Sequence, residues 1–448
     1  MVDSSFKRGF PIALALLPLA YIIWLCVSLH VDIPFGDQWE LVPRLNHLDA
    51  GTFTFHDVWQ QHNENRIVFP ILLMLGLAWA TDWSVSVEIA VNVVLGMAIF
   101  AVYAVALRSM CRDAIRRPVP SAVAGWWALP VISLLVFSPA QWENWLWGWQ
   151  MQIFMAVLGS VFGFCLLSGP GRSPRRFAAA IAAGLVSTYS VGSGLPFWVV
   201  GLIALRLNPD QRTGRRLVIW LFASAIALGT YFIGYQQGPG HQSIRSNFTN
   251  LDGIVKLVEY ALTYLGAPVA GFQGTAARLA GALGLATFVG LLISTRMART
   301  TGGFIFPCLI GIQAIADASM TALGRSGYGI DQAMSSRYQT IGAPFWIAIM
   351  LLAVLALHRQ AVPQRRRIWT AVSVCGALAL SVAILDNGRQ GLIGANQRMD
   401  FLRAARPSLV AGINWKMLSR LYIDDVPSIR ERAGILKMLG MSVYREGQ

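Results

Sequence analysis

The sequence predicts an all-α protein that crosses a membrane many times. Of its 448 residues, 55% are hydrophobic and only 13% are charged, and the mean hydropathy is +0.53. Apolar runs recur along nearly the whole chain, and a run such as 10–30 is apolar on every side. Such runs are typical of membrane-spanning helices, whereas a transmembrane β-barrel would alternate polar and apolar residues. The predicted fold class is therefore a polytopic transmembrane helical protein.

Basic residues orient the predicted helices. Six clusters of Lys and Arg follow alternate apolar runs, and these segments contain few acids. Loops rich in Lys and Arg remain on the cytoplasmic side of a membrane, so we expect all six clusters inside, together with the N-terminus. The clusters span residues 7–8, 108–117, 172–176, 206–216, 296–299 and 359–367.

This orientation threads about eleven spans through the membrane. We expect residues 1–386 to form a transmembrane domain with an outer first loop at 31–84. Residues 387–448 should form a small periplasmic helical tail. No small-x-small cleavage site stands out before Asp32, so the first apolar run is expected to remain as an uncleaved helix. The expected spans are 10–30, 85–107, 122–138, 151–168, 178–191, 194–207, 217–236, 274–293, 302–323, 340–358 and 368–386.

Two further segments do not fit as crossings. The run 67–80 is shorter than the roughly 20 residues that a bilayer core requires, and a crossing there would move the cluster at 108–117 outside. We predict an interfacial or re-entrant helix at 67–80 and an amphipathic surface helix at 251–271. The spans 178–191 and 194–207 meet at the glycine-rich tip 191–194. That tip is either a plain tight hairpin or a broken helix that lines a cavity.

The first outer loop holds the candidates for catalysis. Asp37 follows Gly36 in a bent segment just beyond the first span, and Glu40, three residues later, is a candidate for substrate binding. A carboxylate at the membrane surface can act as a general base toward a hydroxyl, which favours Asp37. The alternative is a solvated loop with ordinary surface pairs.

The same loop ends in a second polar motif. Thr54-Phe55-His56-Asp57 matches a capping box and predicts a short helix through about Gln61. If this helix continued, His62 and Arg66 would lie one above the other. His62 and Glu64 are therefore expected beside Asp37 as catalytic groups, and Arg66 is expected to bind an anion.

Two other outer segments supply candidates for substrate binding. The segment 141–150 is rich in tryptophan and contains Trp147 and Gln150. It forms either an interfacial belt or the lining of a sugar site. Arg325, Arg337 and Tyr338 lie near the outer end of the span 340–358, where a guanidinium suits a phosphate through paired hydrogen bonds. The alternative for Arg337 is an anchor that reaches to the headgroups.

The remaining patterns exclude several classes of protein. No Walker A loop, GxGxxG turn, HExxH or GxSxG motif occurs, so nucleotide hydrolysis, redox chemistry and serine hydrolysis have no support. The five cysteines include no CxxC pair, which argues against a disulfide or metal framework. In the tail, Asp425-Val426-Pro427 should begin a helix that ends near Leu439, with Gly440 as its stop.

The order of these parts resembles the GT-C type of integral membrane glycosyltransferases, which use polyprenyl-phosphate sugars. Phe35-Gly36-Asp37-Gln38-Trp39 matches the position of the essential first-loop acid in that family. His62-Asn63-Glu64-Asn65-Arg66, Trp147-Gly148-Trp149-Gln150 and Ser336-Arg337-Tyr338 are similar to motifs of bacterial members. One departure is that the loop has no adjacent acidic pair, since Asp37 and Glu40 stand three apart. The resemblance implies a GT-C-like fold and an undecaprenyl-phosphate sugar as donor.

The first hypothesis is thus an inverting glycosyltransferase on the periplasmic face of a bacterial inner membrane. Asp37 would act as the base, and Arg337, with Arg325 or Arg66, would bind the donor phosphate. The acceptor would be a glycan or a lipid-linked molecule. Because arginines can neutralise a phosphate leaving group, no metal or other cofactor is expected, and no nucleic acid is expected as a partner.

Two hypotheses from other classes remain open. A flippase or transporter of lipid-linked sugars is suggested by the tip 191–194 and by Asp317 inside a span. Against it, polar and aromatic residues gather on the outer side only, and no inverted repeat is visible. A structural subunit of a glycan-export complex is the third possibility.

Overall fold

The computed structural model describes residues 6–115, 125–236, 251–360 and 362–445. These residues are almost entirely helical, and their β pairing is limited to one bridge between His62 and Asn65. The helices of the first half are α1 (Phe6–Leu29), α2 (Leu41–Asp49), α3 (Phe55–Trp59), α4 (Val68–Thr81), α5 (Val85–Ile115), α7 (Ala128–Val136), α8 (Trp142–Leu146), α9 (Met151–Ser168), α10 (Pro174–Thr188), α11 (Phe197–Leu207) and α12 (Gly214–Phe232). Those of the second half are α14 (Leu251–Ala270), α15 (Gly274–Thr295), α16 (Gly302–Arg325), α17 (Ser336–His358), α18 (Pro363–Ala411), α19 (Trp415–Leu418) and α20 (Val426–Leu439).

Eight helical segments of the described chain have the length and apolar composition needed to cross a membrane. They coincide with eight of the expected spans and agree with a multi-pass, all-α membrane protein. The segments are Gly9–Leu29, Val85–Arg112, Gly148–Ser168, Gly214–Phe232, Gly274–Ala298, Gly302–Tyr328, Ser336–His358 and Gln364–Ala411.

The other three expected spans correspond to shorter helices. In the expected span 122–138, the described helix α7 ends at Val136, because Ser138 is extended ahead of Pro139 and cannot continue a helix. Residues 116–124, which include the start of this span and part of a basic cluster, lie outside the described residues. The expected spans 178–191 and 194–207 are α10 and α11, which the short turn Gly192–Gly194 separates.

The two segments that were not expected to cross differ in their outcome. The run 67–80 is helical as predicted, because α4 begins at Val68 and ends where Asp82 takes a left-handed conformation. The segment 251–271 forms α14, but the prediction of a surface helix is wrong for its second half, which is buried against α15, α16 and α17. Glycines allow this close packing, since a Cβ on Gly266 would lie 1.7 Å from the carbonyl oxygen of Ala277 in α15.

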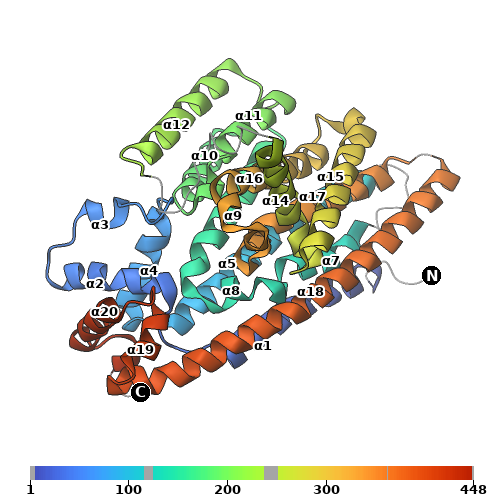
Figure 1. The fold of residues 1–448 in the computed structure, drawn as a ribbon. Coiled ribbons are helices and arrows are strands. Elements are labelled where there is room, and N and C mark those ends of the chain that lie inside the picture. The colour runs from blue at the N-terminus through green and yellow to red at the C-terminus, as the bar shows by residue number, and fades with distance from the viewer. Residues whose placement is uncertain (1–5, 116–124, 237–250, 361, 446–448) are drawn as a thin grey trace.

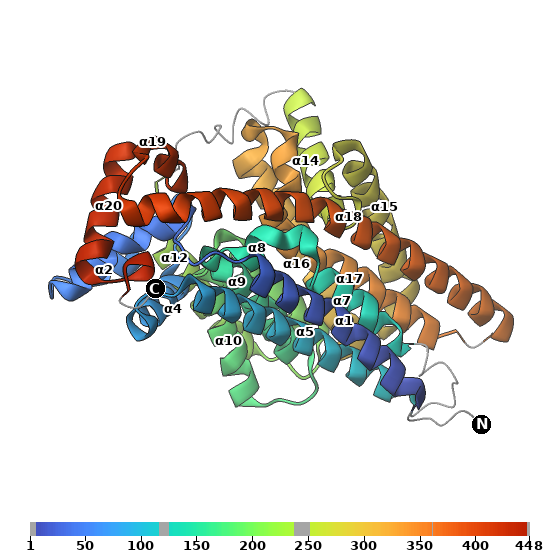
Figure 2. The same cartoon turned by 90° about the horizontal axis from the view of Figure 1, so that it is seen from below.

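The helices have two distinct ends. The first-loop helices α2 and α3 lie at one end with the tail helices α19 and α20, and the start of α1 lies at the other (Figures 1 and 2). The helix α18 runs along the molecule between these ends as one continuous helix of 49 residues. The boundary expected at 386/387 therefore falls inside a helix, and the C-terminal part of α18 reaches the first loop.

Small residues determine where α18 passes. Gly388, Gly391 and Gly394 recur every three residues and face the segment that precedes α8. A Cβ on Gly391 would lie 2.6 Å from the Cα of Ala140, and one on Gly394 would lie 2.8 Å from the Trp142 ring. Because only glycine permits this approach, the spacing holds α18 directly against the tryptophan-rich segment.

Two hydrophobic cores follow from this arrangement. The larger lies between the long helices, and the smaller joins the first loop to the tail through residues such as Trp39, Leu45, Leu421 and Leu436. The predicted tail helix is confirmed as α20, with the Asp425 carboxylate accepting a bond from the amide of Ser428 and with Gly440 left-handed at its end. The tail therefore packs on the first loop.

Candidate functional site

Asp37 lies in a rigid turn. Gly36 has φ +55°, and the Trp147 indole packs so closely that a Cβ on Gly36 would lie 2.6 Å from it. The five residues Gly36–Glu40 form a 3-10 helix. Within it, the Gln38 amide accepts a bond from the amide of Phe35 at 3.1 Å and donates one to the buried Glu88 carboxylate. These contacts fix the backbone that carries Asp37, whose side chain is about one-third exposed.

His62 faces Asp37 from a second turn. The predicted capping box is confirmed, since Thr54 and Asp57 cap α3, but the helix ends at Trp59 instead of continuing. The backbones of His62 and Asn65 then pair with each other across a tight turn, with Asn63 at φ +49°. His62 Nε2 lies 3.6 Å from Asp37 Oδ2, and its ring packs edge-on against Trp149 at 5.0 Å.

Arg337 approaches the same place from the first turn of α17. The charges of Glu143 and Asp37 act on its guanidinium, which also lies over the Tyr338 ring at 5.6 Å. The Asn144 amide donates to the Arg337 carbonyl at 3.0 Å and so fixes the helix start. The Nε–H of Arg337 is buried and finds no acceptor among the described residues.

Arg398, on α18, completes the group. It forms an ion pair of 3.1 Å with Glu143, and its guanidinium lies 4.4 Å from the Phe35 ring and 4.5 Å from the Trp142 ring. Its Nη1 is buried without an acceptor in the part of the chain that the structure describes. We refer to Asp37, His62, Glu143, Arg337 and Arg398 as the charged cluster.

Trp147 contacts this cluster, and Gln150 follows it in the same tryptophan-rich segment. The Trp147 indole donates to the carbonyl of Phe35 at 2.8 Å and contacts Arg398 at 5.3 Å. Gln150 is almost fully buried, and its Oε1 has no described donor. The tryptophan-rich segment therefore supports the cluster from within the protein.

Three of the predicted site residues, Glu64, Arg325 and Arg66, make contacts with other groups. Glu64 is paired with Arg325 at the end of α16. Arg66 is buried, and its guanidinium donates to the carbonyls of Trp59, Tyr231 and Ile233. Arg66 therefore joins the first loop to the end of α12. These bonds occupy donors that a phosphate would need.

Glu40 also points away. Its carboxylate accepts a bond from the Tyr422 hydroxyl and lies 3.3 Å from Arg432, both in the tail. Glu40 therefore joins the first loop to the C-terminal helices, and Asp37 is the first-loop acid that faces the cluster.

Sequence reasoning missed Arg398 and the role of Glu143. Both lie far apart in the chain, and Arg398 stands in a segment expected to be a separate tail. The signal that could have found it is the spacing of Gly388, Gly391 and Gly394, which marks a close helix contact one turn before Arg398.

The geometry indicates two kinds of chemistry. A carboxylate beside an imidazole can accept a proton, and two guanidinium groups with free N–H donors can bind an anion. Comparisons with protein-family models, with curated proteins and with solved structures find no match for this chain.

Proposed function

We propose that the protein is an inverting glycosyltransferase that moves a sugar from a polyprenyl-phosphate donor to an acceptor hydroxyl. The observation that supports it is the charged cluster, where an acid from the first loop, Asp37, meets an arginine from α17, Arg337. In this proposal the chain crosses a bacterial inner membrane, with its N-terminus inside and with the cluster and the C-terminus on the periplasmic face. The three short helices α7, α10 and α11 would complete the eleven crossings.

The proposed reaction uses Asp37 as the general base. Its carboxylate takes the proton of the acceptor hydroxyl, whose oxygen bonds to the anomeric carbon on the face opposite the phosphate. The bond from that carbon to the phosphate oxygen breaks, and its electron pair leaves with the polyprenyl phosphate. His62, whose Nε2 lies 3.6 Å from Asp37 Oδ2, would orient the acceptor or the carboxylate.

Arg337 stabilises the phosphate as negative charge develops on it. The unpaired Nε–H supplies a donor that is already desolvated, so it interacts more strongly than a donor in water. The charge of Asp37 acts on the Arg337 guanidinium, which supports a proposal in which the base and the phosphate-binding group serve the same sugar.

The alternative is a transporter of lipid-linked sugars. The observation that favours it is Asp317, a buried acid in α16 that contacts the glycine-flanked turn through Gln313. Intramembrane acids often mark ion pathways. This alternative makes no use of the base at Asp37.

The test is transfer of a labelled sugar by the purified protein from a panel of undecaprenyl-phosphate hexoses and pentoses. Asp37→Asn should lower turnover by about 10²- to 10⁴-fold, because a general base contributes that much. The control is Asp49→Asn, which removes an exposed acid from the same loop and should leave turnover unchanged. Full turnover in Asp37→Asn would refute the assignment.

A further inference from the structure

A second acid, Asp317, lies inside the bundle and away from the charged cluster. It is only 4% exposed, and its carboxylate accepts a bond from the Gln313 amide at 3.1 Å. Among the described residues, no Lys, Arg or His lies within ion-pair distance of it. An acid at this depth without a cation is costly, which makes a missing partner the first question.

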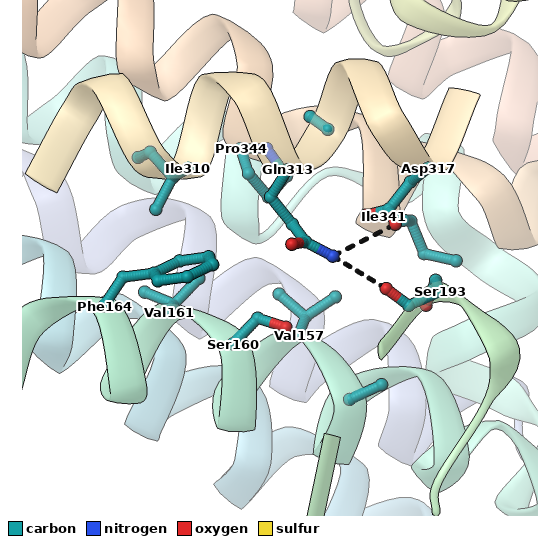
Figure 3. A pocket seen from close by; sticks show the side chains of 12 residues that line it. Val157, Ser160, Val161, Phe164, Ser193, Ile310, Gln313, Asp317, Ile341 and Pro344 are labelled. Carbon is teal, nitrogen blue, oxygen red and sulfur yellow. Dashed lines mark hydrogen bonds between the residues drawn. The ribbon is translucent and has the colours of Figure 1, made fainter. Parts of the chain in front are cut away.

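The hydrogen bonds of Gln313 indicate what kind of partner is missing. Its Nε2 donates to Asp317 and also to the carbonyl of Ser193 at 2.8 Å, so both amide hydrogens are used and the orientation of the amide is determined. Its Oε1 is consequently an acceptor, and this buried atom has no donor in the described chain. Figure 3 shows this oxygen turned into a pocket.

The pocket has apolar walls and a polar side made of acceptors. Its cavity volume is about 20 Å³, which is room for one water-sized species, and Val157, Phe164, Ile341 and Pro344 are among its lining residues. The polar groups that line it are Asp317, Gln313, Ser193 and Ser160.

The hydroxyl of Ser160 is also an acceptor toward the pocket. Ser187 donates its hydroxyl hydrogen to the carbonyl of Ala156 at 2.8 Å. In the 2.7 Å bond between Ser160 and Ser187, the donor must therefore be Ser160. Its hydrogen is used, and only lone pairs of Ser160 remain for the pocket.

We propose that this pocket binds one monovalent cation, for which Na⁺ is the probe. The Asp317 carboxylate, the Gln313 Oε1, the Ser160 hydroxyl and the Ser193 carbonyl present oxygen lone pairs, and the single carboxylate balances one positive charge. Hard cations take carboxylate and carbonyl oxygens as ligands, and carbonyls of interrupted helices coordinate Na⁺ in membrane proteins. The inference does not rest on the proposed sugar transfer, because the charged cluster contributes no residue to the pocket.

The site is also connected to the first loop. The amide of Gly192, next to Ser193, donates to the Asn65 side chain at 2.7 Å. The helix α16, which carries Asp317, ends at Arg325, which pairs with Glu64. A bound cation therefore stabilises the anchor points of the loop that holds His62.

The experiment uses the full-length protein in detergent, with Na⁺, K⁺ or N-methyl-D-glucamine chloride at constant pH and ionic strength. We expect saturable binding of labelled sodium at about one ion per chain. The thermal midpoint should rise by about 3 °C at a hundredfold excess over the half-saturating concentration. N-methyl-D-glucamine should give no rise.

Two variants and a control decide the outcome. Asp317→Asn should abolish both effects, and Gln313→Leu should weaken sodium binding at least tenfold. Asp331→Asn, which removes an exposed acid beyond the end of α16, should bind as the wild type does. Absence of saturable sodium binding in the wild type would overturn the proposal, since Asp317 would then simply carry a proton. Equal binding by wild type, Asp317→Asn and Gln313→Leu would overturn it as well, whatever the sugar-transfer assay shows.

Discussion

The charged cluster and the Asp317 pocket both contain acids that are largely removed from water, but these acids have different partners. In the cluster, the acids Asp37 and Glu143 lie near the cations Arg337 and Arg398, so the charges balance within the protein. In the pocket, Asp317 contacts a neutral amide, and the other polar groups are acceptors. The kind of partner, rather than burial alone, therefore determines what each site can bind. The cluster has unused donors for an anion, and the pocket has unused acceptors for a cation.

The largest expected effect on stability comes from breaking the balance in the cluster. Arg398→Ala removes the ion-pair partner of the partly buried Glu143 carboxylate and leaves Arg337 as the cation of the cluster that still acts on it. Breaking a fully buried pair costs roughly 3–5 kcal/mol, and the partial exposure here lowers the expected loss to about 2 kcal/mol. Thermal unfolding in detergent measures it.

The matched control for this variant is Arg389→Ala on the same helix. Arg389 also lies near an acid, at 4.0 Å from Asp386, but its side chain is 85% exposed. It should leave the thermal midpoint almost unchanged. Similar losses in the two variants would mean that Arg398 is an ordinary surface arginine.

An effect of similar size, on donor use rather than on stability, should separate the hydrogen-bond donors of Arg337 from its charge. If Arg337 binds the donor phosphate as we propose, Arg337→Ala removes a charge-assisted contact worth on the order of 1.5–3 kcal/mol, or about ten- to a hundredfold in donor use. Arg337→Lys keeps the charge without the planar group, and we expect partial recovery. The loss should be the same for every acceptor when turnover is measured against donor concentration. Normal donor use by Arg337→Ala would make this residue a membrane anchor.

The smallest expected effect concerns Asp57, a first-loop acid whose two carboxylate oxygens both have hydrogen-bond partners. Burial raises the pKa of Asp57, but bonds from the Thr54 amide and hydroxyl and from His47 outweigh it, so the pKa is lowered overall. The charged form is therefore favoured in the folded state. Its contribution to stability is present above the unfolded pKa of about 4 and is lost as the pH falls through the lower, folded value.

This sign gives a direct comparison of wild type and Asp57→Asn. The wild type should be more stable at pH 6, and the difference should shrink below about pH 4 as Asp57 becomes protonated. Thermal midpoints across this range measure the change. A difference that grows toward acid pH would contradict the assigned direction.

Local signals in the sequence predicted local structure well. The capping box at Thr54 and the helix from Val426 to Leu439 both depend on residues within one or two turns, and both are confirmed. The long apolar runs likewise predicted eight helices that the structure contains. Each of these features follows from composition and short-range hydrogen bonding.

Features that depend on distant contacts were not predictable in this way. Arg66 was expected at a phosphate, but carbonyls more than 160 residues away, in and beyond α12, occupy two of its donors. The burial of α14 depends on Gly281 in the next helix. Arg398 reaches Glu143 only because α18 continues past residue 386 without a break.

In the proposed function, the charged cluster catalyses the formation of a glycosidic bond. The most direct measurement follows one labelled polyprenyl-phosphate sugar in proteoliposomes and records both its transfer to an acceptor and its movement across the bilayer. We expect a new glycosidic bond that requires Asp37, with no protein-dependent movement of the intact donor. Movement of the intact donor without bond formation would contradict it and would favour the transporter.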